Sequence, residues 1–197
     1  MTRPVVEMAV ASWTLAGQGE CGDLYLVEPY DNGVLLAVVD GIGHGAEAAK
    51  VAKIAVAILK DRPHDLPSIL IRECHESLRA TRGAVLGLAS FNAVHQTMCW
   101  TGVGNVEGKL FSADRQAAPK TLLSSPGTLG HGTVEVRPAE IPVRIGDTLI
   151  LATDGVRHDF YLGLDLHQSP QEIADHILAR SARRSDDALV LVARYTG

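Results

Sequence analysis

The sequence predicts a fold of the α+β class, with sheets in the middle and helices on the outside. Three observations lead to this expectation. The predicted elements run in the order strands, two helices, many short strands, one helix and a final strand. Gly and Pro turns separate the short strands, which favours mostly antiparallel pairing. The 197 residues contain no low-complexity linker and no internal repeat, so we expect one domain over residues 1–197.

The N-terminal strands are predicted from alternation and from one turn. Rough alternation of apolar and polar residues predicts a strand over Val5–Leu15. The dipeptide Asn32-Gly33 is a strong hairpin signal. It predicts that Leu24–Glu28 and Gly33–Val39 pair as neighbouring antiparallel strands.

Two helices are expected next. Ala46–Lys60 is rich in alanine and in other helix formers, and it is apolar on most faces, so it should pack flat on a sheet. The second helix is expected over about Leu66–Ala80, where Pro67 suits the first turn. Its apolar stripe at helical spacing consists of Leu70, Ile71, Cys74 and Leu78.

After Gly83 the apolar pattern changes to the period of strands, and only one further helix is expected, over Pro170–Arg183. The predicted strands are Val85–Val94, Gln96–Val103, Glu107–Ser112, Lys120–Leu123, Thr133–Pro138, Asp147–Thr153 and Ala188–Tyr195.

Composition excludes several classes of function. Apolar residues make up 46% and charged residues 21% of the chain, and the formal net charge is −5. Without a basic patch of the nucleic-acid type, we expect no nucleic-acid partner. The longest apolar stretch is interrupted by charged residues and is too short for a membrane span, so we expect no membrane partner. The first residues, "MTRPVVEMAV", lack the long apolar core of a secretory signal, so we expect none. Three widely spaced cysteines suit reduced thiols, which predicts a cytoplasmic protein.

Acidic residues recur at the ends of the predicted strands. Asp40 and Asp154 each end an apolar run and each precede a glycine, whereas Asp23 precedes a strand. Asp186 and Asp187 together precede the last strand. Each acid alone suits an ordinary turn, because Asp-Gly is a common turn dipeptide. Together they indicate a shared site, since clustered carboxylates repel each other unless a cation lies between them. Oxygen ligands without His or Cys suit Mg²⁺ or Mn²⁺.

Six segments in order carry a resemblance to a known family. They are "GECGD", "VVDGIGHG", "TGVGN", "GTLG", "GDTLILATDGV" and "SDDALVLVARY". The pattern resembles the metal-dependent PP2C-type (PPM) Ser/Thr phosphatases of the SpoIIE/RsbU/RsbX branch, over about Val10 to Tyr195. Thr128 stands where the family usually has proline, and Leu189 where it usually has threonine. Neither position supplies a metal ligand in the family.

The resemblance implies a PP2C-like α-β-β-α sandwich, in which two central and mostly antiparallel sheets are flanked by helices. It also implies a hydrolase that uses two ions of Mn²⁺ or Mg²⁺. Asp40 would bridge the ions and the carbonyl of Gly41 would join one of them. Asp154 and Asp186 would complete the second ion's ligands, with Asp187 as the alternative to Asp186. Asp23 would hold water on an ion or a further ion.

Two residues near these acids keep alternative interpretations. His44 lies within the "DGIGHG" signature and suits a general acid that protonates the leaving serine oxygen. Its place at a predicted helix N-terminus equally suits a structural role, in which it bonds the backbone of the corner. Glu20 either touches water near the ions or is an exposed loop acid.

The resemblance also implies a substrate. The shortness of the chain is similar to the stand-alone RsbX type, whose substrates are phosphorylated Ser and Thr on STAS-domain proteins resembling RsbS and RsbR. The expected function is therefore negative feedback in a bacterial stress response, through dephosphorylation of stressosome proteins. The alternatives are a non-catalytic regulator with a phosphatase fold and a phosphohydrolase of small molecules.

Overall fold

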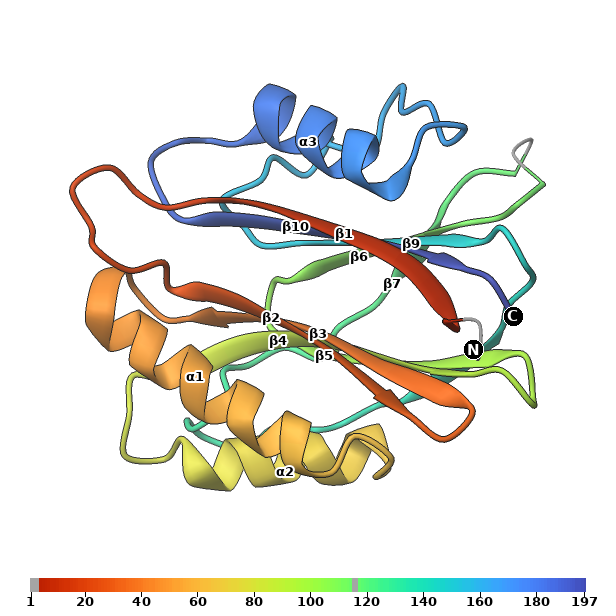
Figure 1. Ribbon diagram of the computed structural model, residues 1–197. Coiled ribbons are helices and arrows are strands. Elements are labelled where there is room, and N and C mark those ends of the chain that lie inside the picture. The colour runs from red at the N-terminus through yellow and green to blue at the C-terminus, as the bar shows by residue number, and fades with distance from the viewer. Residues whose placement is uncertain (1–3, 115–116) are drawn as a thin grey trace.

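The computed structural model describes residues 4–114 and 117–197. Two five-stranded sheets stack face to face, and all neighbouring strands within them are antiparallel (Figure 1). One helix covers the outer face of the upper sheet in this view, and two helices cover the outer face of the lower sheet. This arrangement confirms the predicted α+β class and the α-β-β-α sandwich.

The upper sheet, called sheet A, joins the first and last strands of the chain. Its order is β1 (Val6–Trp13), β10 (Ala188–Tyr195), β9 (Thr148–Ala152), β6 (Glu107–Phe111) and β7 (Lys120–Leu122). Sheet B has the order β2 (Asp23–Tyr30), β3 (Gly33–Gly41), β4 (Ala84–Asn92), β5 (Thr97–Val103) and β8 (Ala139–Pro142). The helices are α1 (Gly45–Asp61), α2 (Pro67–Ser77) and α3 (Pro170–Ser181).

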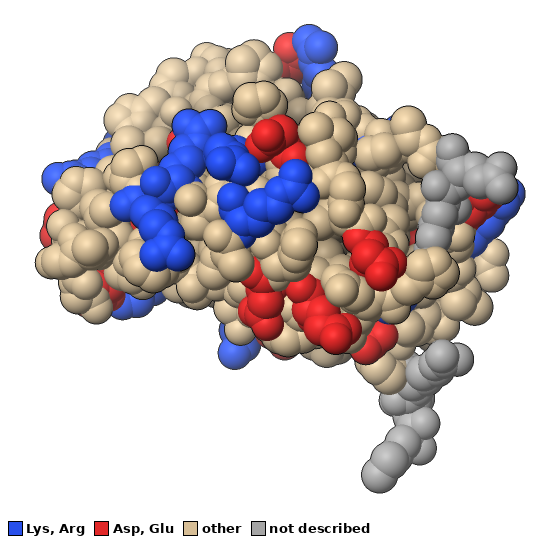
Figure 2. Space-filling model, turned by 90° about the horizontal axis from the view of Figure 1, so that it is seen from above, with Lys and Arg blue, Asp and Glu red and all other residues tan. Residues whose placement is uncertain are grey.

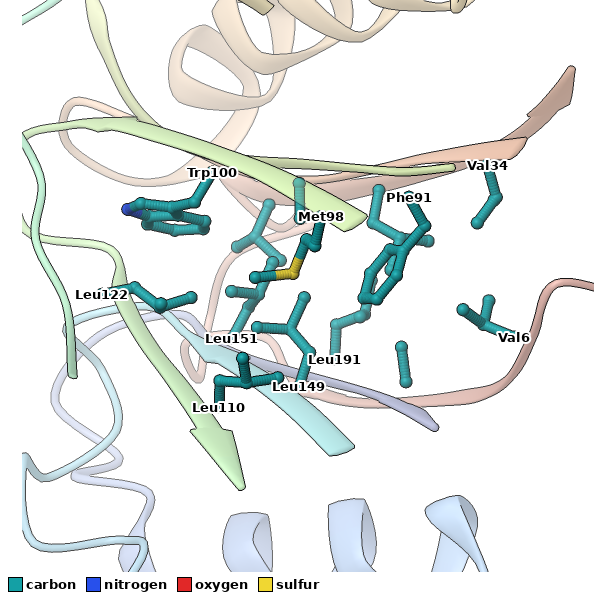
Figure 3. Packing of buried hydrophobic residues seen from close by; sticks show 14 of the residues in the cluster. Val6, Val34, Phe91, Met98, Trp100, Leu110, Leu122, Leu149, Leu151 and Leu191 are labelled. Atoms are coloured by element: carbon teal, nitrogen blue, oxygen red, sulfur yellow. The ribbon is translucent and has the colours of Figure 1, made fainter. Parts of the chain in front are cut away.

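Three apolar layers hold the sandwich together. The layer between the sheets contains Phe91, Met98 and Trp100 from sheet B against Leu149, Leu151 and Leu191 from sheet A (Figure 3). A second layer packs sheet B on α1 and α2, and a third packs sheet A on α3. Strand β3 contributes to two layers: Leu36 and Val38 face the other sheet, whereas Leu35 and Val39 face the helices. This is why its sequence is an unbroken apolar run.

The helices begin as the sequence indicates. Pro67 occupies the first turn of α2. Ser169 caps α3 in a capping box with Glu172, in which each side chain bonds the other's backbone N–H. The buried face of α1 includes Ala48, Ala52 and Ala55, whose small side chains let the helix lie close to sheet B.

One predicted strand is wrong. Residues Thr133–Pro138 form no strand, and the pairing with β5 begins only at Ala139. Val134 and Val136 pack toward the apolar layer under sheet B, while Thr133, Glu135 and Arg137 line a surface cavity. The segment therefore has the alternation of a strand because its two sides differ in exposure, but it joins no ladder of hydrogen bonds.

No helix in residues 4–114 and 117–197 is long and apolar enough to cross a membrane.

Candidate metal centre

The candidate site begins with two acids that face each other across a strand pair. Asp23 opens β2 and Asp40 lies near the end of β3, and their Cα atoms are partners in the antiparallel register. Directly opposed residues point to the same face of a sheet, with Cβ atoms about 5 Å apart. Asp40 follows Leu36 and Val38 at intervals of two, so it points toward sheet A. The two carboxyls therefore lie at one end of the layer between the sheets.

Thr153 connects this pair to sheet A. Its hydroxyl donates to Asp23 Oδ2 at 2.7 Å, and Thr153 Oγ1 itself accepts from the backbone N–H of Leu189 at 2.9 Å. Asp23 and Thr153 are 4% and 2% exposed, so this contact is closed to bulk water. Sequence reasoning missed Thr153, which lies one position before the predicted ligand Asp154. Its role is to fix the orientation of the Asp23 carboxyl.

Asp154 lies just beyond β9 and is exposed, as a group that must meet a ligand should be. Asn105 Nδ2 donates to Asp154 Oδ2 at 2.8 Å. Asn105 belongs to the "TGVGN" segment, which contributes to the family resemblance but from which the sequence predicted no role for Asn105. The structure therefore adds Asn105 to the site as a residue that orients Asp154.

Asp186 and Asp187 have different environments. Asp187 is 3% exposed, and its two carboxylate oxygens accept from the backbone N–H groups of Leu15 and Gly22 at 2.8 and 2.7 Å. It thereby ties the β1–β2 loop to the start of β10. Asp186 is partly exposed, and only its Oδ1 accepts a described hydrogen bond, from the N–H of Asp187 at 2.9 Å. Asp186 thus keeps one carboxylate oxygen that accepts no described hydrogen bond, and Asp187 supports the backbone around it.

The electrostatics link these acids into one group. The pKa of Asp23 is raised to about 7, mainly by burial and also by the charges of Asp187, Asp154 and Asp186, while the hydrogen bond from Thr153 opposes the shift. The pKa of Asp40 is likewise raised to about 8, mainly by burial and also by the charges of the other four acids. Carboxyls with these pKa values resist being ionised together, and a cation between them would remove that resistance.

The donor set fits a hard divalent ion. It offers carboxylate oxygens from both sheets and no Cys or His ligand, which is the chemistry of Mg²⁺ or Mn²⁺ sites. In the described residues, no group of three or more His, Cys, Asp or Glu side chains already forms a cage that could hold an ion by itself. Mg²⁺ commonly keeps several waters and few protein ligands, so a preformed cage is not required for it.

Glycines allow the acids to lie this close together. A Cβ added to Gly41 would lie 2.2 Å from the backbone oxygen of Ala48 in α1. A Cβ on Gly155 would lie 1.8 Å from the backbone oxygen of Asp187. Each glycine of the two Asp-Gly motifs therefore permits a close backbone approach that fixes its aspartate.

The two residues with open interpretations also have clear surroundings. Glu20 is exposed and forms an ion pair with Lys53 of α1, so it behaves as a loop acid. His44 is the exposed N-cap residue of α1, and its side chain makes no capping hydrogen bond. Nothing in its contacts supports the structural role, and its role as a proton donor stays a prediction.

Comparison with known proteins gives consistent matches. The sequence model of the family described as "Stage II sporulation protein E (SpoIIE)" matches residues 30–196. The chain is 23% identical over 181 residues to "Phosphoserine phosphatase RsbX" of Bacillus subtilis (strain 168), covering 91% of this chain and 90% of that protein.

Solved structures agree in fold. A chain from "The bacterial stressosome: a modular system that has been adapted to control secondary messenger signaling" has a TM-score of 0.87 and 31% identity, over 96% of this chain and 99% of that one. RsbX in complex with magnesium has a TM-score of 0.88 and 22% identity, over 100% and 98%. The phosphatase PstP in complex with two manganese ions has a TM-score of 0.75 and 18% identity, over 98% and 99%.

Proposed function

This chain belongs to the SpoIIE family, and from that premise we propose that it is a metal-dependent protein phosphatase of the PP2C type. Its reaction would be hydrolysis of phosphoserine and phosphothreonine, and residues 1–197 would act as one phosphatase domain. The observation that carries the proposal is the acid group at one end of the sandwich. Asp23 and Asp40 of sheet B there share an electrostatic environment with Asp154 and Asp186, which flank strands of sheet A.

The proposed ligands are Asp40 and the Gly41 carbonyl, together with Asp154, Asp186 and Asp23. Two ions of Mg²⁺ or Mn²⁺ suit this set, as RsbX with magnesium and PstP with two manganese ions support. When bound, such ions supply Lewis-acid chemistry for in-line attack of water on phosphorus.

The residues of the chain itself hold this set in position. Thr153 orients Asp23 and Asn105 orients Asp154, each through one side-chain hydrogen bond. His44 is exposed beside the Asp40-Gly41 corner and can deliver a proton to the leaving serine or threonine oxygen. Catalysis then rests on positioning and on charge, with no covalent protein nucleophile.

A paired experiment should distinguish the roles of Asp186 and Asp187, the two acids of the "SDD" segment. Asp186→Asn should weaken Mg²⁺ binding about tenfold or more and leave the melting temperature of the metal-free protein nearly unchanged. Asp187→Ala removes two buried hydrogen-bond acceptors, so it should lower the free energy of unfolding by about 2 kcal/mol or more. Calorimetric Mg²⁺ titration and thermal melts measure the two effects. An Asp186→Asn protein with unchanged Mg²⁺ affinity would transfer the ligand role to Asp187.

The proposed substrates are phosphorylated STAS-domain proteins resembling RsbS and RsbR. The relative named RsbX and the stressosome structure support this choice. Beside the acid group, Arg157, Arg183 and Arg184 are exposed, and backbone hydrogen bonds join residues 155 and 157 to residues 183 and 181. Figure 2, viewed from the α3 side, shows Lys and Arg side chains gathered on this face. A basic surface next to the site suits an anionic phosphoprotein.

We place the reaction in the cytoplasm, as one step of negative feedback in the bacterial stress response. The three cysteines are all free thiols, which suits a reducing compartment. Burial raises the pKa of the Cys21 thiol, next to the site, to about 11. The neutral thiol therefore dominates, and a redox role for it is disfavoured.

The decisive test is phosphate release from phosphorylated RsbS-like and RsbR-like proteins, with Mn²⁺, with Mg²⁺ and with EDTA. We expect release with either ion and none with EDTA. Turnover that persists in EDTA would contradict the metal mechanism. Metal binding without turnover of any substrate would identify a non-catalytic regulator. Efficient turnover of small phosphoesters with none of the phosphoproteins would identify a small-molecule phosphohydrolase.

A further inference from the structure

A groove of about 410 Å³ runs along β6 and the edge strand β7, next to the candidate metal centre. Asn105 lines this groove and also donates to Asp154, so the groove and the acid group are continuous. Lys109 lines it four residues farther along the chain, together with Thr121 on β7 and Tyr161 from the segment after β9. The groove therefore leads away from the place where a phosphate would react.

Lys109 is a buried cation without an acidic partner. The residue is only 8% exposed. Its ammonium donates to Thr121 Oγ1 at 3.0 Å and lies 4.4 Å from the centre of the Tyr161 ring. No carboxylate in residues 4–114 and 117–197 lies within the 4.0 Å of an ion pair with it. An ammonium has three N–H donors, so donors remain for an incoming anion.

The position of Lys109 is costly unless it binds something. Burying a charge without a counter-ion is unfavourable, and a methionine of similar length would fill the same space without that cost. Thr121 and Tyr161 hold the ammonium in one place at the wall of an open groove. A fixed cation with spare donors is a suitable receptor for a carboxylate.

We propose that this groove binds the polypeptide on one side of the substrate's phosphoresidue, and that Lys109 there binds the carboxylate of an Asp or Glu side chain. The inference rests on the proposed phosphatase function and adds a sequence preference to it. Lys109 lies four positions after Asn105, which corresponds to at most about 13 Å of extended chain. The acidic residue should therefore lie about three to five positions from the phosphoserine.

The remaining charge in the groove limits what can bind. Glu107 also lines it, two positions from Lys109 and on the same face of β6. A second phosphate group carries about two negative charges, and the carboxylate of Glu107 would repel it more than a single carboxylate. The groove therefore favours an acidic side chain over a doubly phosphorylated segment.

The test uses synthetic phosphoserine peptides with Gln at every flanking position except one Asp, which is moved through positions three to five on either side. For the wild-type protein with Mn²⁺, we expect kcat/KM for the best Asp peptide to exceed that of the all-Gln peptide about tenfold. Lys109→Met should abolish this difference and keep para-nitrophenyl phosphate turnover within about twofold. Lys109→Gln replaces the Met variant if that variant fails to fold.

Lys120→Met is the matched control. Lys120 is an exposed lysine on β7, opposite Leu110, and it does not line the groove, so its variant should keep the Asp preference. Equal rates for Asp and Gln peptides in the wild type, or a preference that survives in Lys109→Met, would overturn the proposal. Fluorescence anisotropy of the unphosphorylated Asp and Gln peptides measures their affinity for the groove independently of turnover. Tighter Asp-peptide binding without any phosphate release would support the groove and reject the proposed function.

Discussion

Asp40→Asn should reduce phosphatase turnover by about a thousandfold or more and should also make the metal-free protein more stable at alkaline pH. The loss of turnover follows from the proposed bridging role, because ion binding supplies several kcal/mol of transition-state stabilisation. The gain in stability follows from the acid group, in which burial and four neighbouring acids oppose the charge on Asp40. One substitution should therefore change activity and stability in opposite directions.

The sign of the pH effect follows from the raised pKa. The Asp40 carboxyl has a pKa of about 8 in the folded protein and an ordinary value of 3.8. Between these values the folded chain holds a proton that the unfolded chain releases, so the wild type loses stability as pH rises through this window. Asn does not ionise and avoids this loss. We expect the metal-free variant to melt higher than the wild type at about pH 8.5, by about 3 °C or more, and equally near pH 4.

Adding Mg²⁺ should reverse the order of stability. Binding to the folded state raises the melting temperature of the wild type, whereas the variant lacks the proposed bridge and should respond much less. Thermal melts with EDTA and with saturating Mg²⁺ at both pH values measure this. An Asp40→Asn protein that gains no stability in EDTA would show that the neighbouring acids do not repel Asp40. A variant that keeps its response to Mg²⁺ would show that Asp40 is not a metal ligand.

Most of the fold could be predicted from local patterns. The run Gly33–Val39 is apolar without interruption because β3 is covered on both faces, and Pro67 marks the start of α2. The segment Thr133–Pro138 misled the prediction because exposure alternates along it as it does along a strand. Alternation reports which side chains are covered, whereas pairing depends on a neighbouring strand that a local pattern does not contain.

The acids of the candidate site could be predicted from the sequence, whereas the residues that orient them could not. Asp40 and Asp154 are conspicuous because each follows an apolar strand and precedes a glycine. Thr153 and Asn105 act through contacts with Asp23 and Asp154 that span 130 and 49 positions of sequence. In the sequence, Lys109 is indistinguishable from any other lysine in a strand, because its neighbours Thr121 and Tyr161 are apparent only in the structure. Partners brought together by strand pairing or by sheet stacking leave no local signal.

Gly155→Ala should be among the most damaging small substitutions in the chain. A Cβ at this position would lie 1.8 Å from the backbone oxygen of Asp187 and 2.8 Å from its carbonyl carbon, so the backbone on one side must move. The carbonyl of Gly155 also accepts from the N–H of Arg183 at 2.8 Å, and that bond resists the movement. We expect the free energy of unfolding to fall by about 3 kcal/mol or more, which is about 6 °C or more in melting temperature.

Two controls separate steric strain from ligand loss in this Asp-Gly pair. A Cβ on Gly19 would meet nothing within 4 Å, so Gly19→Ala should change the free energy of unfolding by less than about 0.5 kcal/mol. Asp154→Asn should abolish turnover without lowering the melting temperature, because Asp154 is exposed and keeps a side-chain oxygen for Asn105. Gly155→Ala should lose both stability and Mg²⁺ affinity, since the moved backbone carries Asp154 on one side and Asp186 and Asp187 on the other. A Gly155→Ala protein with the melting temperature of the wild type would contradict the close approach of the backbones at Gly155 and Asp187.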